Sequence, residues 1–106
     1  MNINEIAEHA YKRALERGKI TEVSAPMKRY AECTNSLKDE FCELLKANED
    51  VSSEHISEYS EVQEELVDIL IVCLTELHRR NDNVERIIMR KLDYVIIYNP
   101  NLMQYE

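Results

Sequence analysis

The sequence predicts an all-α fold: a four-helix bundle-like domain that is oligomeric and ends in an irregular C-terminal tail. The chain has 1 Gly and 2 Pro among 106 residues, too few for the many tight turns of an all-β fold. The strong helix formers Glu, Leu, Lys and Arg are abundant. Apolar residues recur three and four positions apart through most of the chain, which is the period of an amphipathic helix.

Hydrophobic spacing and end signals place four helices. An Asn cap precedes the first helix and Gly18 ends it, because glycine readily takes the left-handed conformation found after helix ends. The second helix is expected to start somewhere after Pro26, and Asp82 is the predicted cap of the fourth. The expected ranges are about 4–16, from beyond Pro26 to about 46, 57–80, and from Asp82 onward.

We expect a helical domain over residues 1–94 and a tail over 95–106. The segment "YVIIY" is β-branched and aromatic, and Asn-Pro-Asn follows it as a turn signal. At this length the chain forms one domain with a modest core.

Composition narrows the classes of function. A formal net charge of -8 argues against a groove for a nucleic-acid polymer, whose surface would be basic. The apolar run 66–74 is far shorter than the ~20 residues that span a bilayer, and the N-terminus has no signal-peptide core, so no membrane partner is expected. Cys33, Cys42 and Cys73 form no CxxC pair, which indicates a reduced, cytoplasmic protein.

Two acidic pairs recur in matching surroundings. Glu40 and Glu43 lie in "LKDEFCELL", and Glu65 and Asp68 lie 25 residues later (65 − 40 and 68 − 43) in "VQEELVDIL". Residues three apart are neighbours on a helix, so each pair presents two carboxylates on one side. If the two apolar stripes pack together, four carboxylates converge. Asp68 carries the strongest signal, because an unpaired charge inside "LVDILIVCL" needs a compensating partner.

Convergent carboxylates predict a metal site. Two like charges ~4 Å apart repel by about 4 kcal/mol at an effective dielectric constant of 20, so a bound cation or a retained proton must relieve them. A set of oxygen ligands suits Mg²⁺, with Mn²⁺ as the other choice, rather than zinc. A di-iron site is excluded, since no His has a Glu three residues before it.

These motifs resemble the MazG-like, all-α nucleoside triphosphate pyrophosphohydrolases. The resemblance is carried by "DEFCE", "EELVD" and "RIIMRKLDY", and it covers the chain from the first helix to Tyr94. The family signature is a Glu-x-x-Glu on one helix and a Glu-x-x-Asp on the next. The resemblance implies Mg²⁺-dependent hydrolysis of a nucleoside triphosphate to monophosphate and pyrophosphate, in nucleotide-pool cleaning. Glu40, Glu43, Glu65 and Asp68 would then hold the metal.

The motifs define the general base and the substrate contacts less sharply than the metal ligands. Glu40 or Glu64 is the candidate general base that takes a proton from the attacking water, and Asp39 is a further choice. The resemblance suggests Lys91, Arg90 and Tyr94 as substrate contacts. Lys91 near a helix end is equally explained as a charge that complements the helix dipole. Val95 and Tyr98 stand where family members often have an Asn and an Arg.

The third helix also has a second apolar side, formed by Val67, Ile71 and Leu74. A homodimer or homotetramer that buries this side is expected, and a monomer whose tail covers it is the alternative. The alternative function is a helical, oligomeric metal-binding or interaction protein that has lost turnover.

Overall fold

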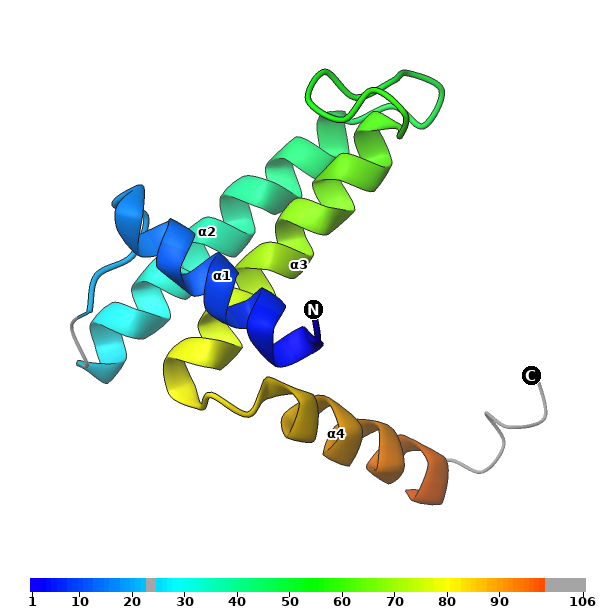
Figure 1. Cartoon of the computed structure of the whole chain (residues 1–106). Helices are drawn as coiled ribbons and strands as arrows, with labels where there is room; N and C mark the ends of the chain where they lie inside the picture. Colours follow the sequence, from blue (N-terminus) through cyan, green and yellow to red (C-terminus); the bar gives the residue numbers. More distant parts are fainter. Residues whose placement is uncertain (23–24, 99–106) are drawn as a thin grey trace.

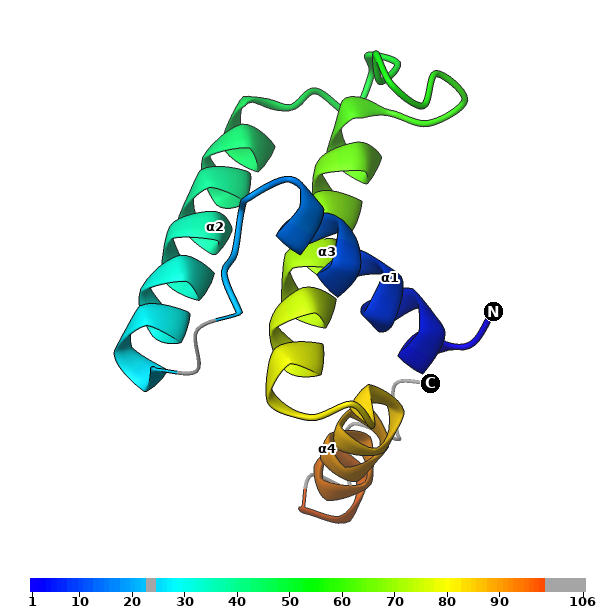
Figure 2. The same cartoon turned by 60° about the vertical axis from the view of Figure 1, so that its left-hand side comes forward.

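The computed structural model describes residues 1–22 and 25–98 and confirms the all-α prediction. It contains four helices: α1 (Ile3–Glu16), α2 (Pro26–Lys46), α3 (Glu61–Arg80) and α4 (Val84–Tyr98). Helices α2 and α3 lie side by side and are joined by loop 47–60 (Figures 1 and 2). Helix α1 crosses α3, and α4 lies across the far end of α3. The bundle-like arrangement stays a prediction for the single chain.

Capping residues decide where α1 and α3 begin. Asn2 accepts a hydrogen bond from the Glu5 backbone N–H at 2.9 Å, so α1 starts at Ile3. Ser60 and Gln63 form a reciprocal capping box, so α3 starts at Glu61. The predicted start near residue 57 is wrong, because residues 57–60 belong to a loop with its own backbone hydrogen bonds, including Ser53 N–H to Tyr59 C=O at 2.8 Å.

Helix α4 differs from the prediction at both ends. The Arg86 backbone N–H donates to Asn83 Oδ1 at 3.2 Å, so Asn83 rather than Asp82 acts at the N-terminus. The prediction of irregular structure from residue 95 is wrong for residues 95–98, because α4 continues to Tyr98. Strand propensity depends strongly on neighbouring strands, and no described strand is present to override helix propagation. The rest of the predicted tail, 99–106, lies outside the described residues.

Gly18 reverses the chain at the end of α1. Its φ is +70°, a conformation that costs about 1 kcal/mol or more for residues with a Cβ. The Gly18 N–H donates to Leu15 C=O and the Lys19 N–H donates to Ala14 C=O, both at 3.0 Å. This pair of hydrogen bonds is the Schellman motif, and it turns Lys19 back toward the α2–α3 pair.

The fully buried core is small and lies where α1, α3 and α4 meet. It consists of Ala7, Leu74 and Val84, with Ile3 and Leu77 packed against it. Leu74, which we expected on the uncovered side of α3, is therefore covered by α1 and α4. None of the described helices has the length and apolar character needed to cross a membrane.

Helix α2 contributes no buried side chain and is held to α3 by an ion-pair network centred on Arg79. The Arg79 side chain is 3% exposed. It donates to Glu32 of α2 at 2.8 Å, to the Thr21 carbonyl at 3.0 Å, and to both carboxylate oxygens of Glu76 at 3.2 Å. Arg80 adds a second donor to Glu76 at 2.9 Å. The Arg79 guanidinium holds the pKa of Glu32 below its usual value.

Replacing Arg79 with Met should destabilise the fold by about 3 kcal/mol, because it leaves two carboxylates without their main cation. Urea unfolding followed by circular dichroism measures this loss. Lys12→Met is the matched control: Lys12 pairs with Glu8 at 3.0 Å, but both side chains are about half exposed, so the change should be under about 1 kcal/mol. Equal effects of the two substitutions would contradict a structural role for the Arg79 network.

Candidate metal centre

Three of the four predicted metal-ligating carboxylates meet between α2 and α3. Glu40 of α2 and Glu65 and Asp68 of α3 each offer an oxygen, and these oxygens lie within 4.8 Å of one another. Glu65 and Asp68 are three apart and share one side of α3, while the side-by-side packing of α2 brings Glu40 opposite them. We call Glu40, Glu65 and Asp68 the carboxylate cluster.

Burial and mutual repulsion raise the proton affinity of the cluster. Burial raises the pKa of Glu40, and the charge of Asp68 raises it further. The same two causes raise the pKa of Glu65. For Asp68, burial comes first and the charge of Glu64 second. Oxygen Oε2 of Glu65 is buried without a hydrogen-bond partner among the described residues. None of the three carboxylates forms an ion pair within the described residues, and their oxygens suit a hard divalent cation.

Glu43, the fourth predicted ligand, lies outside this group of oxygens. Its carboxylate is 3.7 Å from Lys46 on the same helix, and both side chains are more than half exposed. Such a pair contributes little to stability. The structure thus brings together one acid from the first predicted pair and both acids from the second.

The carboxylate of Glu64, a candidate general base, binds residues of loop 47–60. The Ser53 hydroxyl donates to one carboxylate oxygen at 2.5 Å, and His55 Nδ1 lies 2.7 Å from the other. The hydrogen bonds from Ser53 and then His55 lower the pKa of Glu64, and Glu64 in turn raises the pKa of His55. A carboxylate with lowered pKa is a weak proton acceptor. Of the two candidate bases, Glu40 has the higher proton affinity.

Ser53 and His55 were missed at the sequence level. Ser53 is 2% exposed, and its hydroxyl also accepts the backbone N–H groups of His55 and Ile56. A serine two residues before His55 in a polar loop is a weak turn signal, and nothing in the sequence shows that it reaches Glu64. Through these contacts the loop is anchored one residue away from Glu65.

The predicted substrate contacts on α4 lie apart from the cluster within one chain. Lys91 Nζ sits 4.8 Å from the centre of the Tyr94 ring, and Arg90 is exposed on the same helix. Helix α4 runs away from the α2–α3 pair beyond the end of α3 (Figure 1). The described cavity beside the cluster is lined by α1, α2, α3 and the turn after α1.

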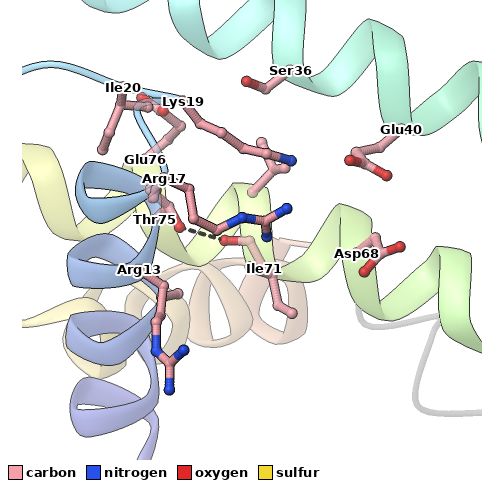
Figure 3. A pocket seen from close by; sticks show the side chains of 13 residues that line it. Arg13, Arg17, Lys19, Ile20, Ser36, Glu40, Asp68, Ile71, Thr75 and Glu76 are labelled. Carbon is pink, nitrogen blue, oxygen red and sulfur yellow. Dashed lines mark hydrogen bonds between the residues drawn. The ribbon is translucent and has the colours of Figure 1, made fainter. Parts of the chain in front are cut away.

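This cavity has a volume of about 120 Å³ and brings opposite charges close together. Glu40 and Asp68 stand on one side, and Arg17 and Lys19 extend from the end of α1 toward them (Figure 3). Its apolar lining includes Ala10, Ala14, Ile20, Ile71 and Val72. Arg17 and Lys19 belong to none of the predicted motifs. Their one signal in the sequence is that they flank Gly18, the glycine that ends the first helix.

No protein-family model, curated protein or solved structure matches the chain. The resemblance to the MazG-like pyrophosphohydrolases therefore rests on the motifs alone.

Without divalent cations, Asp68→Asn should stabilise the protein at neutral pH. The folded-state pKa of Asp68 is raised, so the wild type loses stability as the pH rises from about 4, the ordinary carboxyl range, through that raised value. Asp68→Asn lacks this loss. At pH values above the raised pKa, its free energy of unfolding should therefore exceed that of the wild type by on the order of 1 kcal/mol. The gain should shrink as the pH falls toward about 4.

Urea unfolding in EDTA at several pH values measures the difference. Asp93→Asn makes the same change at an exposed position of α4 and is the matched control; it should leave the free energy of unfolding nearly unchanged. A variant that is less stable than the wild type at every pH would mean that Asp68 has a favourable partner instead of a repulsive one.

Proposed function

We propose that the chain is a Mg²⁺-dependent nucleoside triphosphate pyrophosphohydrolase of the MazG-like type. The observation that supports this most directly is the convergence of Glu40, Glu65 and Asp68 from two helices. All three acids belong to the two pairs that recur 25 residues apart in the sequence. A hard divalent cation held there neutralises phosphate charge and favours ionisation of a bound water.

The chain itself supplies the ligands, the base and the scaffold. Glu65 and Asp68 of α3 and Glu40 of α2 would hold the cation. In the reaction, a water oxygen attacks phosphorus, the bond between the first and second phosphates breaks, and pyrophosphate leaves. Glu40 is the candidate to accept the proton of the attacking water, because Glu64 is held by Ser53 and His55. Glu64, tied to Ser53 and His55, fixes the start of α3 beside the ligands.

The second candidate function is a helical metal-binding or interaction protein without turnover. The position of Lys91, Arg90 and Tyr94 on α4, apart from the cluster within one chain, favours it. The two functions share the cation site and differ in whether a nucleotide is cleaved.

An incubation of the purified chain with a panel of nucleoside triphosphates separates them. Mg²⁺-dependent release of pyrophosphate, abolished by EDTA, is the expected result. Glu65→Gln should lower the rate by roughly 100-fold or more, because even indirect partners of metal ligands change activity by 10–100-fold. Glu43→Gln is the matched control and should retain most activity, since Glu43 lies outside the cluster.

Cation binding without hydrolysis of any nucleotide would favour the non-catalytic protein. Equal losses in Glu43→Gln and Glu65→Gln would restore Glu43 as a fourth ligand. Absence of both cation binding and hydrolysis would exclude the enzyme and the metal-binding protein and would leave an interaction protein.

We further propose that the chain acts as a homodimer or homotetramer in the cytoplasm. Helix α2 is without a buried side chain, and Phe41 is 54% and Leu45 70% exposed. On α3, Leu66 is 52% and Leu70 50% exposed. Exposed large apolar side chains on neighbouring helices favour burial against another subunit. The three free cysteines accord with a reducing compartment.

Sedimentation equilibrium at micromolar concentration should give a mass of at least two chains. Leu70→Arg should lower the mass, because it places a charge in the proposed contact. Val51→Arg changes an exposed apolar residue of loop 47–60 and should leave the mass unchanged. A monomeric wild type, or equal effects of both changes, would contradict the proposed contact.

A further inference from the structure

Arg17 and Lys19 are two exposed cations beside the carboxylate cluster. Neither side chain forms a hydrogen bond or an ion pair with any residue of the described ranges 1–22 and 25–98. Both line the 120 Å³ cavity and extend toward the side on which Glu40 and Asp68 stand (Figure 3). Arg13 also lines this cavity, but its guanidinium points away from the two carboxylates.

The end of α1 determines where these cations lie. Arg17 is the C-cap residue, and its backbone N–H donates to Arg13 C=O. Gly18 then takes its positive φ, and the Lys19 N–H returns to Ala14. The two side chains on either side of Gly18 are thereby brought to the same cavity. Lys19 and Glu40 also line a neighbouring cavity of about 320 Å³, so Lys19 stands between two spaces that adjoin the cluster.

The charge distribution selects a class of ligand. Across the cavity, the side chains of Lys19 and Arg17 extend toward Glu40 and Asp68 (Figure 3). A divalent cation at the cluster would therefore be repelled by Lys19 and Arg17. A ligand whose negative charges lie between the metal and these side chains removes that repulsion, and a chain of phosphates has this property. The apolar lining near Ala14 and Ile71 suits an uncharged part of such a ligand.

We propose that Arg17 and Lys19 bind the phosphate chain of the ligand held at the carboxylate cluster. This inference rests on the proposed function and adds the side chains that hold the polyphosphate. It assigns within one chain the contacts that the sequence motifs placed on Lys91 and Arg90. The cavity is smaller than the roughly 300–1,000 Å³ of pockets that enclose a drug-sized ligand, so it accommodates a portion of the nucleotide.

A simpler role for Lys19 is that of a counter-ion that relieves repulsion among the carboxylates. The two roles differ in the effect that Lys19→Gln has on polyphosphate binding. Removing a counter-ion alone strengthens the binding of Mn²⁺ and leaves phosphate binding unchanged. Removing a phosphate ligand also strengthens the binding of Mn²⁺ alone, but it weakens the binding of a polyphosphate in the presence of the cation.

The test uses the full chain and two probes. Mn²⁺ is titrated alone, and the free ion is followed by electron paramagnetic resonance. A non-hydrolysable methylene analogue of inorganic triphosphate is titrated by calorimetry at saturating Mg²⁺. We expect Arg17→Gln and Lys19→Gln each to weaken analogue binding about tenfold, Lys19→Gln to tighten Mn²⁺ binding, and Lys19→Arg to retain analogue binding. Lys12→Gln removes the same charge from an exposed position of α1 and should change neither titration.

Analogue binding that is absent from the wild type, or unchanged in both Arg17→Gln and Lys19→Gln, would overturn the inference. Pyrophosphate release from the nucleotide panel is scored separately. If the wild type releases pyrophosphate but both variants keep wild-type analogue binding, the inference fails and the proposed function stands. If the analogue binds through Arg17 and Lys19 but no nucleotide is cleaved, the inference stands and the proposed function fails.

Discussion

The buried guanidinium of Arg79 is the interaction on which the arrangement of the helices depends most. Helix α2 has no buried side chain of its own, so apolar packing in the single chain holds it only partly. Arg79 adds the polar contacts that hold α2 against α3. It binds Glu32 of α2 and Glu76 of α3, together with the Thr21 carbonyl before α2. Because Glu40 lies two turns beyond Glu32 on α2, this anchor also fixes how close Glu40 comes to Asp68.

The α2–α3 pair has opposite electrostatic character at its two ends. Near Arg79 every carboxylate has a cation: Glu32 binds Arg79, and Glu76 binds Arg79 and Arg80. At the carboxylate cluster like charges are brought together, and Asp68 raises the pKa of Glu40 and Glu65. The paired end stabilises the contact between the helices, and this offsets the repulsion at the other end. Negative charge held in place by a rigid scaffold suits a divalent cation.

Helix positions followed from local signals wherever those signals were unambiguous. Gly18 marked the end of α1 correctly, and α2, expected to start somewhere after Pro26, begins at Pro26 itself; both residues act through backbone geometry that neighbouring elements hardly change. Ser60 was missed as the start of α3, because several residues in "SSEHISEYS" have capping side chains and only the fold of loop 47–60 selects one. The end of α4 was missed because "YVIIY" has strand propensity with no strand beside it.

By itself the sequence determined the helices and the carboxylates on each helix face, because spacing along a helix fixes which residues are neighbours. It therefore specified Glu65 with Asp68 and Glu40 with Glu43 as pairs. Only the tertiary structure decided that Glu40 joins the cluster while Glu43 stays outside it. It alone also directed Glu64 to Ser53 and His55, and Arg17 and Lys19 to the cavity. Those contacts join residues distant in sequence, and the angles at which helices pack determine them.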